Sequence, residues 1–163
     1  MTTLASKRVH IRRAAREDLR AMLQIERASF SDPWSEESMA TTLSSQGMLV
    51  LVANESGEGA GDGAARLVGY VVALVIAPDA EIADLAIAPD ARRRGTGRAL
   101  LARAIDDLTE LGVQRVHLEV RESNLAARTL YESTGFRAAG RRRGYYREPL
   151  EDALLLTRQI GPT

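Results

Sequence analysis

The chain contains no cysteine among its 163 residues. This absence excludes disulfide bonds, thiolate metal sites and any reaction that passes through an acyl-cysteine intermediate. The two histidines, His10 and His117, lie far apart in the sequence and give no metal-ligand spacing, so we expect no metal ion. The chemistry of the chain therefore has to be sought in its other polar residues and in its backbone.

The chain also lacks a surplus of charge and a long apolar run. Lysine and arginine together number 22, as do aspartate and glutamate, so the formal net charge is zero. A general nucleic-acid binder usually carries excess positive charge, and we therefore expect no direct contact with nucleic acid. No apolar run approaches the ~20 residues of a membrane span, and the N-terminus has no apolar signal core. These features predict a cytoplasmic protein that does not associate with a membrane.

Length and composition indicate one ordinary domain over residues 1–163, because 45% of the residues are hydrophobic and 27% are charged. Apolar periodicity and turn residues predict the element order β-α-α-β-β-β-α-β-α-β-β, which is typical of a mixed α/β sheet. Two strands are expected after the last helix. Residues 141–146 are expected to form a polar, aromatic turn before the final strand. The predicted strand ranges are 8–12, 48–53, 67–76, 81–88, 115–121 and 152–156.

Capping residues mark two of the helices, and a glycine-rich segment marks one loop. Ser35 is expected to cap the second helix, with Trp34 and Met39 at the two positions of a hydrophobic staple. Asn124 is expected to cap a short helix near the end of the chain. Residues 54–66 are rich in glycine and carry acidic residues without a following helix signal, which predicts a surface hairpin loop rather than a phosphate loop.

The most informative segment runs over residues 84–101. It begins as an apolar strand and continues through a Pro-Asp turn, three arginines and two glycines one residue apart into an amphipathic helix. Glycines at such a junction let successive backbone N–H groups turn inward at a helix N-terminus, where the helix dipole favours negative charge. Arginines on the same turn add groups suited to phosphate oxygens. The segment predicts a site for a pyrophosphate-bearing ligand, and the alternative is a solvated arginine turn before an ordinary helix.

The spacing of the arginines and glycines in this segment narrows the choice of ligand. Leu100 stands where a dinucleotide-binding fingerprint needs a small residue, and the Gly-Lys-Ser/Thr end of a Walker A loop is missing. Residues 92–97 instead resemble the Arg/Gln-x-x-Gly-x-Gly/Ala signature of the GNAT acetyltransferases. This resemblance implies the single-domain GNAT fold, a mostly antiparallel sheet of about seven strands flanked by four helices, and acetyl-CoA as cosubstrate. The loop residues that it assigns to the pyrophosphate are Arg92, Arg93, Arg94, Gly95, Thr96, Gly97 and Arg98.

A narrower resemblance covers nearly the whole chain. Residues 117–136, together with 33–36, 142–146 and 151–153, are similar to the RimI-type protein N-terminal acetyltransferases. The resemblance implies that the acceptor is a protein N-terminus, namely the N-terminal alanine of a small-subunit ribosomal protein. Because the chain has no cysteine, we expect direct attack in a ternary complex, and we expect a monomer. A lysine or small-amine acetyltransferase and a non-catalytic acyl-CoA-binding regulatory module are the alternatives.

Glu119 is the candidate general base. It lies on strand 115–121, whose apolar residues point one way, so that its carboxylate points the other way. From this pattern alone, Glu119 either takes a proton from an ammonium substrate, directly or through water, or pairs with Arg115 or Arg121 on a solvent-facing strand. The catalytic glutamate of the RimI-type enzymes falls on this position, and the resemblance therefore implies the first role.

Tyr131 is the candidate general acid. It follows Asn124 by about two helical turns, so the two side chains share one helix face. The pattern leaves open whether Tyr131 supplies a proton to the departing CoA thiolate or is a core aromatic residue beside Leu130 and Phe136. The resemblance implies the acid role for Tyr131 and a CoA contact for Asn124, which is compatible with a helix cap.

The remaining candidates act through backbone or through aromatic walls. The GNAT resemblance implies that the backbone of Leu85, Ala86 and Ile87 pairs with the pantetheine arm on a strand that splays from its neighbour, and that the amide of Ile87 polarises the thioester carbonyl. Candidates for the acceptor groove are Trp34, Tyr145 and Tyr146. The staple alone would also explain the tryptophan, and a surface position would explain the tyrosine pair. The arginines at 141–143 are expected to form a solvated face or to assist acidic substrates rather than to bind RNA.

Overall fold

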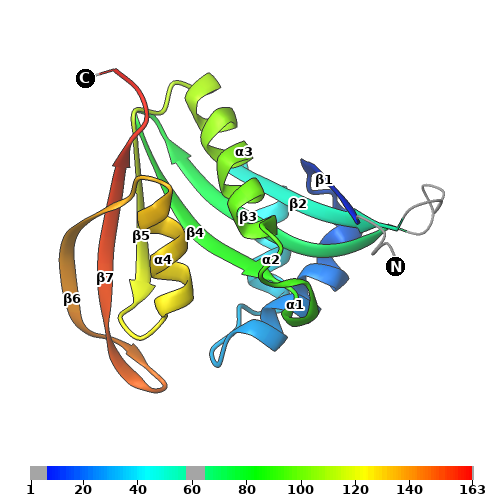
Figure 1. Ribbon diagram of the computed structural model, residues 1–163, viewed down its shortest axis with the longest axis horizontal. Helices are drawn as coiled ribbons and strands as arrows, with labels where there is room; N and C mark the ends of the chain where they lie inside the picture. The colour runs from blue at the N-terminus through cyan, green and yellow to red at the C-terminus, as the bar shows by residue number, and fades with distance from the viewer. Residues whose placement is uncertain (1–6, 58–64, 163) are drawn as a thin grey trace, which may run out of the picture.

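The structure is a computed structural model that describes residues 7–57 and 65–162. Seven strands form one sheet in the order β1-β2-β3-β4-β5-β7-β6, and every neighbouring pair is antiparallel except β4 with β5. The predicted element order and fold class are thereby confirmed (Figure 1). The elements are β1 (Arg8–Arg13), α1 (Leu19–Ser29), α2 (Glu36–Ser44), β2 (Met48–Ser56), β3 (Arg66–Ile76), β4 (Asp79–Ile87), α3 (Thr96–Glu110), β5 (Arg115–Arg121), α4 (Leu125–Ser133), β6 (Arg137–Arg147) and β7 (Leu150–Gln159).

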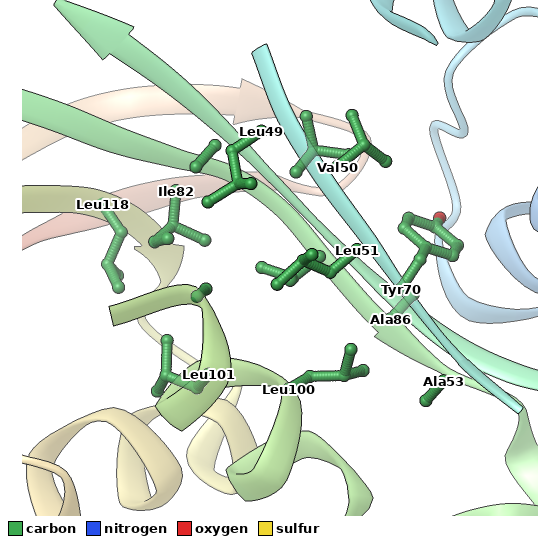
Figure 2. Packing of buried hydrophobic residues seen from close by; sticks show 14 of the residues in the cluster. Leu49, Val50, Leu51, Ala53, Tyr70, Ile82, Ala86, Leu100, Leu101 and Leu118 are labelled. Atoms are coloured by element: carbon green, nitrogen blue, oxygen red, sulfur yellow. The ribbon is translucent and has the colours of Figure 1, made fainter. Parts of the chain in front are cut away.

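Helices cover both faces of the sheet, because the inner strands are apolar on both sides. Two adjacent residues of β3 show the arrangement: a Cβ atom at Gly69 would meet Leu100 of α3, whereas the hydroxyl of Tyr70 reaches Glu26 of α1 on the opposite face. Figure 2 shows the ring of Tyr70 pointing away from Leu100 and Leu101. Helices α3 and α4 thus share one face, and α1 and α2 share the other (Figure 1). In the described residues, no helix is long and apolar enough to cross a membrane.

Strands β4 and β5 pair over four residues only. Asp79–Ile82 of β4 lies beside 115–118 of β5, and beyond this point β4 continues along β3 while β5 continues along β7. A bulge in β4 falls at the same place, since Ile82 and Asp84 oppose consecutive residues of β3. The two strands therefore separate toward their C-terminal ends, as Figure 1 shows. The splay implied by the GNAT resemblance is confirmed.

Both predicted helix caps are present. Ser35 Oγ accepts a hydrogen bond from the backbone N–H of Ser38 at 3.1 Å, and Asn124 Oδ1 accepts one from Ala127 at 3.1 Å. The staple pair of α2 also lies in the apolar interior, with Met39 fully buried and Trp34 partly buried. The local sequence therefore sets where these helices begin.

Two predictions of loop boundaries are wrong. Residues 141–146 belong to β6 rather than to a turn, and the connection to β7 is made by Glu148 and Pro149 instead. Strand β6 is the exposed edge of the sheet, so its side chains need no apolar alternation, and backbone pairing with β7 holds it. In the predicted loop 54–66, the first three residues belong to β2 and Arg66 opens β3, whereas 58–64 lie outside the described residues.

Candidate active site

The glycine turn forms the start of α3. Gly95 is the N-cap residue with a φ of +83°, a left-handed conformation that costs little only for glycine. No side chain caps this helix, so its first amides are open to an anion. At Gly97, a Cβ atom would lie 3.4 Å from Leu130 Cδ2 and 3.7 Å from Ile87 Cγ1. Residue 97 therefore borders the space between α4 and the end of β4.

Two arginines of the turn are held by the protein itself. The Nε of Arg92 donates to the carbonyl of Ile87 at 3.0 Å, and its guanidinium also donates to Ser29 Oγ at 3.1 Å. Arg94 forms a 2.6 Å ion pair with the buried carboxylate of Glu55. The structure thus turns these two guanidinium groups toward neighbouring elements, and the backbone amides are the better-placed part of the anion site.

The other residues of the turn occupy different environments. Arg93 is exposed and has a φ of +64°, while Thr96 is buried at the first position of α3. Arg98 donates to Ser133 Oγ of α4 at 2.8 Å. The contact joins the start of α3 to the end of α4, so the two helices flank the same opening.

The end of β4 presents backbone groups to the gap between β4 and β5. The N–H of Ala88 donates to the carbonyl of Val68 at 2.7 Å, on the β3 side. Because backbone groups alternate in direction along a strand, the N–H and C=O of Ile87 point away from β3. Arg92 donates a hydrogen bond to the carbonyl of Ile87, and the amide of Ile87 faces the gap.

Glu119 lies on the β5 side of the same gap, and its partner comes from β6. Its Oε1 is 3.0 Å from the Nε of Arg142, and the side chain of Glu119 is 19% exposed. Arg115 and Arg121 pair with other carboxylates, so the predicted alternative pairing of Glu119 with either of them is wrong. The carboxylate remains accessible at a point where a cation already contacts it.

Two tyrosines of β6 stand beside this carboxylate. A hydrogen bond with Glu119 is the first cause of the raised pKa of Tyr145, and burial is the second. Burial, followed by the charge of Glu119, raises the pKa of Tyr146 to about 12. The two rings meet edge to face at 5.1 Å, and the guanidinium of Arg121 lies 4.2 Å from the ring centre of Tyr146. The structure therefore brings both predicted acceptor-groove tyrosines to the candidate base.

Tyr131 approaches from α4. Its side chain is 7% exposed, and its ring packs edge to face on Phe136 at 5.7 Å. Burial raises the pKa of the Tyr131 hydroxyl, and the charges of Asp84 and Tyr146 add to the effect. The phenol is therefore protonated at neutral pH and able to donate that proton. Tyr131 has the packing of a core aromatic residue, and this packing is compatible with the acid role.

The connection between α1 and α2 touches the turn between β6 and β7. Ser31, between α1 and α2, donates from its hydroxyl to the carbonyl of Glu148 in the β6–β7 turn at 2.9 Å. Trp34 lies in the same α1–α2 connection, and its backbone N–H donates to Glu26 at 3.0 Å. Asn124 is exposed at the other side of the site, where its side chain serves as the cap of α4.

A buried polar cluster beneath the site was missed by the sequence reasoning. Glu26 of α1, Tyr70 of β3 and Asp84 of β4 are 1%, 0% and 9% exposed. The Tyr70 hydroxyl donates to Glu26 Oε2 and lies 3.4 Å from Asp84 Oδ2. The sequence held one signal of this cluster, namely that Glu26 lies in the buried apolar stripe of α1. An acidic residue in such a position needs a polar partner. In the described ranges 7–57 and 65–162, no three His, Asp or Glu side chains form a metal-binding group.

The sequence of the chain is similar to those of known proteins. The sequence pattern of the "Acetyltransferase (GNAT) family" matches residues 19–136. The chain is 38% identical over 146 residues to the [ribosomal protein bS18]-alanine N-acetyltransferase of Escherichia coli strain K12, covering 88% of this chain and 93% of that protein. It is 32% identical to the putative enzyme of the same name from Bacillus subtilis strain 168, covering 90% and 92%.

Solved structures show the same architecture. The crystal structure of the ribosomal-protein-S18-alanine N-acetyltransferase from Escherichia coli superposes with a TM-score of 0.83 and 34% identity, covering 96% of each chain. Arabidopsis thaliana NAA60 in complex with acetyl-CoA has a TM-score of 0.84 at 22% identity, covering 94% of this chain and 99% of that one, and at this identity the likeness concerns the fold alone.

Proposed function

The chain belongs to the GNAT acetyltransferase family, and we propose that it transfers the acetyl group of acetyl-CoA to the N-terminal alanine of ribosomal protein bS18. The observation that carries this proposal is the position of Glu119. Its carboxylate borders the gap between the diverging strands, beside the two tyrosines of β6. The names of the relatives support the acceptor, and the geometry supports an amine as the attacking group.

Acetyl-CoA binding is assigned to three sets of groups. The first amides of α3, from Thr96 onward, receive the pyrophosphate at the positive end of the helix dipole. The backbone of Leu85–Ile87 pairs with the pantetheine arm, since β5 does not occupy that edge of β4. Asn124 contacts the cosubstrate from the start of α4, while its Oδ1 caps the helix.

Three groups carry the reaction in one direct transfer. Glu119 takes a proton from the α-ammonium group, directly or through water, and the free amine attacks the thioester carbonyl carbon. The amide of Ile87 donates a hydrogen bond to the oxygen on which negative charge develops. As the C–S bond breaks, Tyr131 gives its proton to the CoA sulfur, and the second proton released from the nitrogen restores the phenol. The chain has no cysteine for an acyl-enzyme intermediate.

Arg142 occupies the place of a substrate cation. Its guanidinium contacts Glu119 at 3.0 Å, and more than half of the arginine side chain is exposed. An incoming ammonium group has to share or replace this contact. Tyr145 and Tyr146 provide the adjacent walls, and Trp34 provides a third wall from the α1–α2 connection.

We further propose that the chain acts as a single domain, as a monomer in the cytoplasm, without direct contact with nucleic acid. The charge balance of 22 basic and 22 acidic residues supports the last point. The acceptor itself is a protein N-terminus.

Two synthetic peptides with the bS18 N-terminal sequence and one internal lysine test this function. One keeps its free α-amine, and the other has this amine dimethylated, so that only the lysine side chain is free. We expect acetylation of the first peptide at the α-amine by mass spectrometry, with release of CoA thiol. Equal acetylation of the blocked peptide would indicate a lysine acetyltransferase. Acetyl-CoA binding without thiol release from either peptide or from small amines would indicate a binding module.

A further inference from the structure

The buried cluster of Glu26, Tyr70 and Asp84 connects the acceptor side of the site to strand β4. Glu26 binds the backbone N–H of Trp34 through Oε1 at 3.0 Å and binds the Tyr70 hydroxyl through Oε2. Asp84 follows the β4 bulge, two residues after the last β4 residue that pairs with β5. A single chain of contacts thus runs from the α1–α2 connection to the point at which the strands separate.

The geometry of this cluster limits how its three side chains can share protons. A phenol has one proton, and Tyr70 gives it to Glu26. If Asp84 were ionised, the contact of 3.4 Å between the Tyr70 oxygen and Asp84 Oδ2 would bring two oxygens together with no proton between them. A proton on Asp84 converts this contact into a hydrogen bond from the carboxyl group to the phenol oxygen. Two carboxylates face one phenol proton, and this geometry favours a second proton in the cluster, on Asp84.

The electrostatic environment of Asp84 also favours its protonated form. Burial is the main cause that raises the pKa of Asp84 to about 9, and the neighbouring carboxylate of Glu26 adds to it. The titratable groups around Asp84 are Glu26 from α1, Tyr70 from β3 and Tyr131 from α4. A backbone hydrogen bond from Leu85 and the contact with the Tyr70 hydroxyl act in the opposite direction, and they do not outweigh the burial.

We propose that protonated Asp84 acts through Tyr70 and Glu26 as a positioning residue, which fixes the α1–α2 connection against β4. The proposal rests on the proposed function, because it assigns this connection to the acceptor side of an acetyl-transfer site. Loss of the Asp84 proton places two carboxylates on one phenol and repels them from each other. The Glu26 carboxylate then shifts, and the Trp34 segment that it binds shifts with it.

Trp34 is the only tryptophan in the chain, so its fluorescence reports directly on this segment. We expect the emission of the wild-type protein to change between pH 8 and pH 10. Asp84→Asn keeps a neutral side chain whose NH₂ donates to the Tyr70 oxygen at every pH, so it should lack this transition. Ionisation of Tyr145 and Tyr146 affects both proteins alike and cancels in the comparison. The same transition in both proteins would overturn the proposal.

Steady-state kinetics test the effect on the acceptor. The ratio of the acceptor-peptide KM of the wild type to that of Asp84→Asn should rise about tenfold from pH 7.5 to pH 10, because the carboxyl of Asp84, with its raised pKa, loses its proton as the pH rises through this range. This ratio cancels the titration of the peptide amine. The KM for acetyl-CoA should keep a constant ratio. A flat acceptor ratio, or equal changes in both KM values, would contradict positioning.

Two further variants separate positioning from general damage. Tyr70→Phe removes the shared hydroxyl and should raise the acceptor KM about tenfold at pH 7.5, with the acetyl-CoA KM within about twofold. Asp79→Asn is the matched control, since Asp79 lies on the same strand but pairs with Arg115 at the surface, and it should change neither KM. If wild-type protein acetylates no peptide, the proposed function fails, while the fluorescence comparison still decides whether Asp84 sets the position of Trp34.

Discussion

Replacement of Tyr131 by phenylalanine separates chemistry from packing at the candidate acid. The ring of Tyr131 is 7% exposed and rests edge to face on Phe136 at 5.7 Å, and phenylalanine keeps that contact. The change removes only the hydroxyl and adds no atom, so the ring keeps its packing. We therefore expect the free energy of unfolding to change by less than about 0.5 kcal/mol.

The rate should respond very differently. Without the phenol proton the CoA thiolate has to leave as an anion, and we expect the single-turnover rate to fall about tenfold to a thousandfold. Acetyl-CoA affinity, measured by calorimetry, should stay near that of the wild type. Rapid-quench single turnover is the required assay, because slow product release would hide a chemical defect in steady state.

A matched variant makes the result decisive. Tyr131→Leu removes both the hydroxyl and the aromatic packing, and should lose about 2–4 kcal/mol of stability in addition to rate. If Tyr131→Phe unfolds more easily but turns over at the full rate, the residue is a core aromatic alone. The acid would then have to be sought at Tyr145 or Tyr146, which stand beside Glu119.

Glu119→Gln should keep acetyl-CoA affinity and lower turnover by a factor of about 10²–10⁴. The loss of turnover should shrink as the pH rises past about 8, the pKa of the α-amine of the acceptor. Full activity at neutral pH would exclude Glu119 from the mechanism. Gly97→Val should weaken acetyl-CoA binding at least about tenfold by calorimetry in a folded protein, because the valine methyl groups project between Leu130 and Ile87. Unchanged affinity would contradict the assignment of the glycine turn to acetyl-CoA binding. The free energy of unfolding should fall from about pH 4 to about pH 9, because Asp84 has its pKa raised from 3.8 to about 9 in the folded protein and keeps a proton that the unfolded chain releases. Urea titrations of Asp84→Asn should show a flatter dependence on pH, and an unchanged slope would contradict the raised pKa of Asp84.

The sequence predicted those features whose causes are local. The caps at Ser35 and Asn124 follow from one side chain and an amide three residues away. The start of α3 follows from Gly95, since its φ of +83° favours glycine. The buried face of β5 follows from strict alternation of apolar residues. Each of these can be recognised in a short stretch of sequence without knowledge of the rest of the fold.

The features that escaped prediction depend on distant segments. Strand β6 is exposed along nearly all of its length, so backbone pairing rather than an apolar pattern defines it. The ion pair of Glu119 with Arg142 follows from the order of strands in the sheet, which places β7 between β5 and β6. Glu26 and Tyr70 are 44 residues apart, and only packing of α1 on β3 reveals that they share a proton. The resemblance supplied the roles of Glu119 and Tyr131, which pattern alone left open.

The four-residue pairing of β4 with β5 gives the molecule two strand edges in its own interior. Beyond Ile82 and Leu118, each half of the sheet ends in a row of backbone donors and acceptors like those of an outer edge, which normally recruit another extended chain. An extended ligand seated there completes both halves and adds cohesion across the divide. Occupancy of this seam should therefore slow the exchange of β4 amide hydrogens and raise resistance to unfolding, so that the substrate serves as a missing strand of the fold.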